Sequence, residues 1–276
     1  MLFETLQAQA QRLTTSLAPL GGEGEIVWYR WGSGPVLVLL HGGTGSWRHW
    51  VRNIGFLAES YTVLAADMPG LGESAMAPGP AEPQSVAAAL AASLAELLGP
   101  ERSYDLAGFS FGSNIGTHLA AIEGAHVRSH TIIGAASLGF LRQPVELLKI
   151  RDKQGEERMA THRLNLNALM LKNPANIDDE AVRIQEWNTV NARLRSRGFA
   201  SGSSLKDQLP HVAAPMRAIW GEFDQVAWPH IPERLAMLHE ARPELISQII
   251  PGAGHWVMYE APDAFNAALL RMLQAK

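Results

Sequence analysis

The sequence predicts an α/β protein in which helices cover both faces of a mostly parallel sheet, with a helical insertion in its second half. Short runs rich in β-branched and aromatic residues alternate with helix-length segments, which is typical of parallel strands joined by helices. The alternation stops between about residues 138 and 213, where long helical patterns contain no convincing strand. The length of 276 residues fits one core domain with such an insertion.

The N-terminal segment, residues 1–20, alternates polar and apolar residues, and we expect it to form a short amphipathic helix. It lacks the uninterrupted apolar run of a signal peptide. No apolar stretch in the chain approaches the roughly 20 residues that a membrane-spanning helix needs. We therefore expect no membrane insertion.

The core elements follow in order along the chain. We expect strands where short apolar runs are bounded by Gly or Pro, at residues 26–31, 36–40, 61–66, 104–109, 131–133, 216–220 and 246–250. Helix-length segments lie between most of them, at residues 47–57, 84–98, 111–122 and 229–240. These elements assign residues 1–137 and 214–276 to the core domain.

The insertion covers residues 138–213. Helical patterns occupy residues 146–149, 156–171 and 179–197, and Asn173-Pro174 and Asp178 separate them. Asp178 or Asp179 supplies an N-cap for the last helix. The only dense basic stretch, Arg193 to Arg197, lies on this expected helix, so we interpret it as a solvated helix face.

The composition excludes several classes of protein. With 47% hydrophobic residues, 18% charged residues and a net charge of −4, the chain lacks the clustered positive charge of a nucleic-acid binder. It contains no cysteine, which excludes disulfides, thiolate metal sites and a cysteine nucleophile, and which agrees with a cytoplasmic location. No metal-binding histidine motif is present, so we expect neither a metal nor a cofactor.

The candidate nucleophile is Ser110, which lies in the only G-x-S-x-G motif of the chain, G-F-S-F-G at residues 108–112. The motif follows an expected strand and precedes an expected helix, as a nucleophile on a sharp strand-to-helix turn requires. Small neighbours two residues before and after Ser110 make such a strained turn sterically possible. The N-terminus of the next helix would then stabilise an oxyanion.

A serine hydroxyl needs a neighbouring imidazole as general base, and that imidazole needs an acid to orient it. His255 follows the last expected strand in P-G-A-G-H-W, and Asp224 follows the strand before it in W-G-E-F-D. Both therefore lie at the carboxyl edge of the sheet, where the catalytic groups of such folds gather. Glu222 competes for the role of the acid, and Asp105 and Asp67 are weaker alternatives.

The loop after the expected strand 36–40 reads H-G-G-T-G-S-W at residues 41–47. Its glycines allow backbone N–H groups to face a cavity. We expect the N–H groups of Gly43 and Phe111 to form an oxyanion hole.

Five ordered blocks of this sequence resemble the α/β-hydrolase family across nearly the whole chain. They are H-G-G at residues 41–43, D-M-P-G-L-G-E-S at 67–74, G-F-S-F-G at 108–112, W-G-E-F-D at 220–224 and G-A-G-H-W at 252–256. The resemblance implies an α/β-hydrolase fold and identifies residues 138–213 as the lid, or cap, of that family. It also implies that residues 67–74 form a structural turn in which Asp67 bonds to the backbone.

Within that family, the sequence around His41 and the segment from Gly254 to Glu260 resemble the meta-cleavage-product hydrolases, which break carbon–carbon bonds. Those enzymes place Asn before and Met after the nucleophile, whereas Phe109 and Phe111 stand here. They also carry a lid arginine where Glu186 or Trp187 falls in this chain. Arg183, Arg193 or Arg195 could substitute for it. The same pattern is similar to small carboxylesterases, lactonases and perhydrolases.

The first hypothesis is therefore a serine hydrolase that cleaves a small carboxylic ester or lactone through an acyl-enzyme on Ser110. We expect Gly42, Phe109, Trp187 and Trp256 to contribute to a largely apolar substrate site. The alternative is carbon–carbon hydrolysis of a 2-hydroxy-6-oxo-dienoate, which additionally needs a lid cation facing the pocket. A third possibility is a non-catalytic binding protein, against which the complete triad argues. We expect a small-molecule substrate and a monomer or homodimer.

Overall fold

The computed structural model describes residues 1–141, 143–195 and 202–275. Its centre is an eight-stranded sheet with the strand order β1-β2-β4-β3-β5-β6-β7-β8. The pairs β1–β2 and β2–β4 are antiparallel, and all pairs from β4 to β8 are parallel. The strands are β1 (Gln11–Ser16), β2 (Glu25–Trp31), β3 (Val36–Leu40), β4 (Thr62–Asp67), β5 (Tyr104–Phe109), β6 (Val127–Ile133), β7 (Met216–Gly221) and β8 (Ile246–Ile250).

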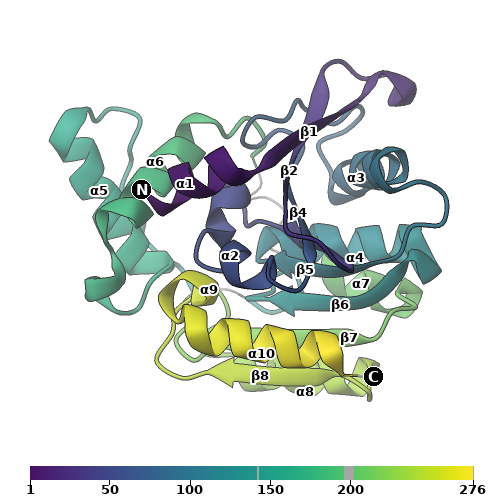
Figure 1. Ribbon diagram of the computed structural model, residues 1–276. Coiled ribbons are helices and arrows are strands. Elements are labelled where there is room, and N and C mark those ends of the chain that lie inside the picture. Colours follow the sequence, from purple (N-terminus) through teal and green to yellow (C-terminus); the bar gives the residue numbers. More distant parts are fainter. Residues whose placement is uncertain (142, 196–201, 276) are drawn as a thin grey trace.

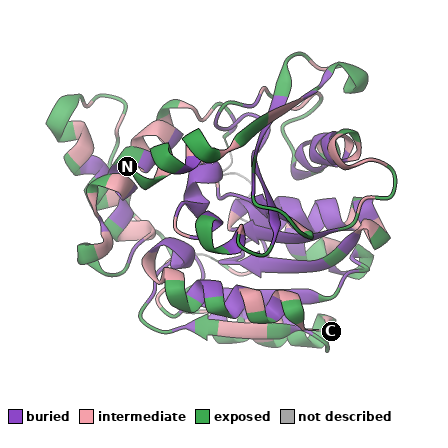
Figure 2. Ribbon diagram, in the orientation of Figure 1, coloured by how far each residue is buried: buried purple, intermediate pink, exposed green. Residues whose placement is uncertain are grey.

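Helices cover both faces of this sheet, so the central strands are buried on both sides (Figure 1, Figure 2). In β3 the side chains of Val38 and Leu40 pack into one hydrophobic cluster, and those of Leu37 and Leu39 into another. The first cluster includes side chains of α3 (Pro83–Leu98), α4 (Phe111–Glu123), α7 (Ser204–Gln208) and α8 (Ile231–Ala241). The second includes those of α1 (Leu2–Gln9), α2 (Ile54–Leu57), α9 (Val257–Glu260) and α10 (Pro262–Gln274). The expected α/β fold class is confirmed.

The segment 138–213 contains the helices α5 (Gly155–Leu169) and α6 (Asp179–Val190), then α7, with no strand among its described residues. Figure 1 shows α5 and α6 at one end of the molecule, beside the N-terminal α1. The backbone N–H of Phe3 donates to the Glu180 carboxylate at 3.1 Å, which ties α1 to α6. Short 3-10 turns complete the chain at Ala18–Leu20, Trp47–Trp50, Gly124–His126, Pro174–Asn176 and Leu209–His211.

The expectation of one helix over residues 1–20 is wrong in its second half. The helix ends at Gln9, and β1 pairs with β2 as the edge strand of the sheet. Leu13 is the only apolar residue of β1, so its sequence shows no clear strand pattern. Thr15 points inward, and its hydroxyl lies 2.5 Å from that of Ser93.

Several other elements differ from the sequence expectation. β6 begins at Val127 and not at residue 131, and the helices α7, α9 and α10 were not expected. Residues 146–149 form no helix, and the expected helix 47–57 is divided into the 3-10 turn Trp47–Trp50 and the short α2. The expected helix 179–197 ends at Val190, so Arg193 and Arg195 lie beyond it, and Arg197 lies outside the described residues. Within the described ranges, we find no helix with the length and apolar character needed to cross a membrane.

Candidate active site

Ser110 lies on a tight turn between β5 and α4. Its backbone has φ 52° and ψ −110°, in a region that residues with a side chain rarely adopt. The turn is held by its backbone N–H, which donates to the Ile133 carbonyl of the neighbouring strand β6 at 2.7 Å. The side chain is partly exposed, so its hydroxyl is presented at the carboxyl edge of the sheet.

The glycines of the motif are required by close backbone packing. A Cβ on Gly108 would lie 2.2 Å from the Gly112 carbonyl oxygen, and a Cβ on Gly112 would lie 2.5 Å from the Leu40 carbonyl oxygen. Any larger residue would force β5, α4 and β3 apart. The G-x-S-x-G pattern therefore follows from the geometry of the turn.

The structure brings Ser110, His255 and Asp224 together in one hydrogen-bonded chain. His255 Nε2 lies 2.9 Å from Ser110 Oγ, and His255 Nδ1 lies 2.8 and 2.9 Å from the two carboxylate oxygens of Asp224. An acceptor at Nδ1 favours the tautomer with its proton there, which leaves Nε2 free to accept the serine proton. Asp224 is fully buried and His255 is 3% exposed.

The carboxylate of Asp224 is itself held by the loop that follows β7. Its Oδ1 accepts hydrogen bonds from the N–H groups of Val226 at 2.8 Å and Ala227 at 3.2 Å. These bonds stabilise the charged form in a buried place and fix its direction. Gly134 leaves room for the pair, because a Cβ there would lie 3.1 Å from both the Asp224 carboxylate and the His255 ring.

The other acids weighed from sequence have different partners. Glu222 accepts from the Gly252 N–H at 2.9 Å, on the outside of the histidine loop. Asp105 pairs with Arg128 and Ser129. Asp67 accepts from the N–H groups of Trp47 and Glu73 at 2.9 Å each, and burial raises its pKa to about 6. Among the described acids, Asp224 alone forms a hydrogen bond with His255.

The loop after β3 carries Gly42 and Gly43, and two histidines hold it. The Gly42 N–H donates to His49 Nδ1 at 3.2 Å, and His41 Nδ1 lies 2.8 Å from the Gly42 carbonyl oxygen. Burial lowers the pKa of His41 to about 4 and holds that of His49 well below its usual value. Neither histidine has a role that the sequence predicts, because their contacts appear only when the loop folds back on itself.

Phe111, the second expected oxyanion donor, is the first residue of α4. The positive end of the helix dipole therefore lies beside Ser110. The two expected donors lie on different segments, Gly43 in the loop that follows β3 and Phe111 at the start of α4.

The aromatic residues expected at a substrate site have unequal positions. The Phe109 ring lies 4.9 Å from the His255 ring, and Phe109 and Trp256 both contact His49, at centroid distances of 5.6 and 5.0 Å. Both are fully buried. Trp187, on α6, is partly exposed and stacks against the Arg48 guanidinium at 3.6 Å.

None of the described arginines in residues 138–213 forms a hydrogen bond or ion pair with Ser110 or His255. Glu186, which with Trp187 is where the resemblance to meta-cleavage-product hydrolases implies a lid arginine, pairs with Arg158 and His162 at 2.7 Å each. Of the three possible substitutes, Arg183 and Arg195 are exposed, and Arg193 donates to the carbonyl oxygens of Gly72 and Ser74. The described residues also contain no group of three His, Asp or Glu that could hold a metal ion.

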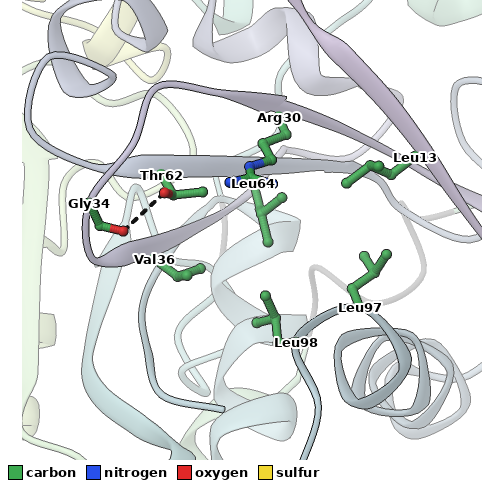
Figure 3. A pocket seen from close by; sticks show the side chains of 8 residues that line it. All are labelled: Leu13, Arg30, Gly34, Val36, Thr62, Leu64, Leu97 and Leu98. Atoms are coloured by element: carbon green, nitrogen blue, oxygen red, sulfur yellow. Dashed lines mark hydrogen bonds between the residues drawn. The ribbon is translucent and has the colours of Figure 1, made fainter.

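A cleft of about 270 Å³ lies at the opposite edge of the sheet (Figure 3). Val36 and Thr62, which line it, are the first residues of β3 and β4, whereas Ser110 follows the last residue of β5. The cleft is open and mainly apolar, with Leu97 and Leu98 of α3 forming one wall. It is separate from the triad and offers no nucleophile or base.

The sequence and the fold of this chain are similar to those of known proteins. A model of the alpha/beta hydrolase family matches residues 37–268. The chain is 28% identical to the dihydrolipoyllysine-residue acetyltransferase component of the acetoin cleaving system of Pseudomonas putida, over 96% of this chain and 71% of that protein.

Two other relatives are named as hydrolases. A 2-hydroxy-6-oxononadienedioate/2-hydroxy-6-oxononatrienedioate hydrolase of Comamonas testosteroni is 26% identical over 88% of each chain. A pimeloyl-(acyl-carrier protein) methyl ester esterase of Vibrio atlanticus is 25% identical over 90% of this chain and 98% of that protein. The crystal structure of an esterase, RhEst1 from Rhodococcus sp. ECU1013, shares the fold with a TM-score of 0.79 and 19% identity, over 97% of this chain and 99% of that chain.

Proposed function

Since this chain belongs to the alpha/beta hydrolase family and is therefore a hydrolase, we propose that it cleaves a small carboxylic ester or lactone through an acyl-enzyme on Ser110. The observation that carries the proposal is the buried chain of hydrogen bonds from Asp224 through His255 to Ser110. Such a chain gives a serine hydroxyl a base to take its proton and gives that base a fixed orientation.

In the proposed first half-reaction, Ser110 Oγ attacks the substrate carbonyl carbon while His255 Nε2 takes the hydroxyl proton. The carbonyl oxygen gains negative charge, which the N–H groups of Gly43 and Phe111 stabilise together with the N-terminus of α4. Asp224 stabilises the imidazolium that forms. His255 then gives its proton to the departing alcohol oxygen, and the acyl group stays on Ser110.

In the second half-reaction, His255 takes a proton from a water molecule, and the resulting hydroxide attacks the acyl carbon. The tetrahedral intermediate collapses, Ser110 recovers its proton from His255, and the carboxylic acid leaves. Every step uses groups that the site already holds, and none requires a metal or a cofactor.

We assign residues 138–213 to a lid over this site and expect it to select the substrate. Contacts of the lid with the loops of the site support this assignment. The Ser46 hydroxyl donates to the Asn188 side chain on α6 at 2.7 Å, and the Trp256 N–H donates to the Met170 carbonyl at 2.8 Å. The lid thus meets both the oxyanion loop and the histidine loop. We expect Trp187 and the rings of Phe109 and Trp256 to make the acyl side of the site apolar.

Carbon–carbon hydrolysis of a dienoate remains the second candidate, because the Comamonas relative is named for such a reaction. That reaction would use the same triad and would also need a cation for the substrate carboxylate. The described lid arginines are engaged elsewhere or exposed, and Phe109 offers that carboxylate no hydrogen bond. These contacts favour the ester or lactone. We also propose that the enzyme acts as a monomer or homodimer.

The test is turnover of p-nitrophenyl acetate and p-nitrophenyl butyrate beside a 2-hydroxy-6-oxo-dienoate, with Ser110→Ala as the blank. We expect ester cleavage that depends on Ser110 and little dienoate cleavage. Efficient dienoate turnover would move the assignment to the carbon–carbon hydrolases. Ester turnover that persists in Ser110→Ala would overturn the serine mechanism.

A further inference from the structure

Both hydrogen-bonding groups of Gly42 are bound by histidine rings from the same chain segment. Its N–H donates to His49 Nδ1 at 3.2 Å, and its carbonyl oxygen accepts from His41 Nδ1 at 2.8 Å. The two rings lie 6.1 Å apart at an interplanar angle of 74°. Gly42 is thus held from two sides, whereas a loop glycine ordinarily has wide freedom of rotation.

A third contact fixes the proton on His41. The Met68 N–H donates to His41 Nε2 at 2.9 Å, so Nε2 carries no proton and Nδ1 carries the one that binds Gly42. His49 must have the opposite tautomer, because its Nδ1 accepts from Gly42. Burial lowers the pKa of both rings, which keeps both neutral. His41 Nδ1 is therefore the donor to the Gly42 carbonyl oxygen, and His49 Nδ1 is the acceptor for the Gly42 N–H.

The carbonyl of Gly42 and the N–H of Gly43 belong to one planar peptide unit. The only cis peptide bond found in the described residues is Trp228-Pro229, so this unit is trans and its C=O and N–H point in opposite directions. Fixing the carbonyl on His41 therefore fixes the direction of the Gly43 N–H. A hydrogen bond to the carbonyl also polarises the unit and strengthens the N–H as a donor. Within the described residues, the Gly43 N–H has no acceptor of its own.

We propose that His41 and His49 are positioning residues that together hold the Gly42–Gly43 peptide so that its N–H faces the oxyanion formed on the substrate of Ser110. This inference rests on the proposed function, since it concerns the oxyanion hole of that reaction. Neither ring touches the substrate. Each acts through the backbone of one glycine.

The packing around His49 shows that this ring is built into the loop. A Cβ on Gly45 would lie 2.5 Å from His49 Cε1, and one on Gly42 would lie 2.9 Å from Phe109 Cε1. The backbone carbonyl of His49 accepts from the Trp256 indole at 2.8 Å. Trp256 follows His255 directly, so the same contact links the oxyanion loop to the histidine loop. Besides their expected place at the substrate site, Phe109 and Trp256 therefore pack against the His49 ring and hold it in position.

The test compares three variants at position 49 on a p-nitrophenyl ester that the wild type cleaves. In His49→Asn the amide oxygen can take the place of Nδ1 and accept from Gly42. In His49→Gln the amide lies further out, near the place of Nε2, and in His49→Phe the ring packing stays while the acceptor is lost. His118→Phe is the matched control, because His118 is also buried but binds Ser204 on the other side of the fold.

We expect kcat to fall about 10- to 100-fold in His49→Gln and His49→Phe, with KM within about threefold of the wild type, because a misdirected oxyanion donor acts mainly on the transition state. His49→Asn should keep kcat within about fivefold, and His118→Phe within about threefold. The inhibition constant of a boronic acid, which mimics the tetrahedral intermediate, should rise with the fall in kcat. A purely structural role for His49 would not separate Asn from Gln in this way.

Wild-type kcat in folded His49→Gln or His49→Phe would overturn the inference and leave the serine mechanism standing, as would an equal loss in all three variants. If His49→Gln or His49→Phe is not recovered folded, the other still gives the contrast with His49→Asn. If His49→Asn is not recovered folded, wild-type kcat in either of the other two variants still overturns the inference. Turnover that is independent of Ser110 in the Ser110→Ala blank would remove the proposed function and the inference together. The two failures are therefore distinguishable.

Discussion

The core half of the site and the lid half are held together by different kinds of contact. In the core, buried hydrogen bonds to neutral or paired groups fix Asp224, His255 and Gly42 within one rigid frame. In the lid, α5 and α6 are joined through the partly exposed carboxylate of Glu186, which pairs with the partly exposed Arg158 and with the buried His162. Buried hydrogen bonds tolerate little change, whereas exposed ion pairs contribute little and can be replaced.

Under the proposed function, this difference separates the residues that carry the chemistry from those expected to select the substrate. The catalytic geometry depends on close backbone packing, as at Gly108 and Gly112. The lid depends on side-chain pairs that evolution can exchange without disturbing that geometry. We therefore expect substitutions in the core half to change kcat strongly, and substitutions between the lid helices to change stability and activity weakly.

The largest effect is expected for Asp224→Asn. The amide offers a donor to His255 and disfavours the tautomer that accepts the serine proton, so kcat on a cleaved ester should fall on the order of 10⁴-fold. The fold should survive, because the amide oxygen still accepts from Val226 and Ala227. Steady-state kinetics with circular dichroism as the folding control measures this. A loss below about tenfold would move the orienting acid elsewhere.

Glu260→Ala tests the contact between the histidine loop of the core and the lid. The Glu260 carboxylate accepts from the N–H of Gly254 at 2.6 Å in the histidine loop, and from those of Lys172 at 3.0 Å and Asn173 at 2.6 Å in the lid. Its removal leaves these donors without a partner, so we expect about 1 to 3 kcal/mol less free energy of unfolding and kcat about tenfold lower.

Glu222→Ala is the matched control for Glu260→Ala. Glu222 also binds a backbone N–H of the histidine loop, that of Gly252, but it forms no hydrogen bond with the lid. Urea unfolding and ester turnover should both stay close to the wild type in this variant. Equal effects of the two substitutions would contradict a special link through Glu260.

Acidification should lower the free energy of unfolding through the buried histidines of the core. Burial lowers the pKa of His41 and His130 to about 4 and holds that of His49 well below its usual value, so the unfolded chain binds more protons below pH 6.5. His41 and His130 should each cost the folded state roughly 3 kcal/mol of stability as the pH falls from about 6.5 to about 4. Asp67 acts in the opposite direction, because its pKa is raised to about 6.

The stability lost at the three histidines on acidification should exceed the stability gained at Asp67. The free energy of unfolding should therefore decrease between pH 6.5 and pH 4.5. Urea unfolding at intervals of half a pH unit measures this slope. His130→Asn should flatten it, since that ring lies in the sheet, away from the triad. A stability that rises with acidification would show that the buried histidines are not held neutral.

The smallest effect is expected for Glu186→Gln, which weakens the pair between α5 and α6. The free energy of unfolding should change by about 1 kcal/mol or less, because the carboxylate is partly exposed. Its ester kcat should stay within about threefold of the wild type. Arg163→Gln, at the exposed contact with Asp179, provides a control with no expected effect. A large loss of kcat in Glu186→Gln would place the lid ion pairs within the catalytic machinery.

The sequence was sufficient for the parts of the molecule that depend on local patterns. Strand-turn-helix context placed Ser110, and loops at the carboxyl ends of two strands placed Asp224 and His255, so their meeting follows from the sheet order. The edge strand β1 was missed, because Leu13 is its only apolar residue and its segment was included in the helix expected over residues 1–20. Its strand form depends on pairing with β2, which is a tertiary contact.

Contacts between segments explain the remaining differences from the sequence expectation. The roles of His41 and His49 depend on how the loop after β3 folds over Gly42, and no spacing rule encodes that. The end of α6 at Val190 was also misplaced, because helical propensity alone does not show where tertiary packing ends a helix.

The central claim is that Ser110 is the nucleophile of this hydrolase, and the most direct test is mass spectrometry of the protein after reaction with a fluorophosphonate. We expect a single adduct on Ser110 that is absent in Ser110→Ala and forms much more slowly in Asp224→Asn. An adduct on another residue, or ester turnover that continues while Ser110 stays unmodified, would contradict it.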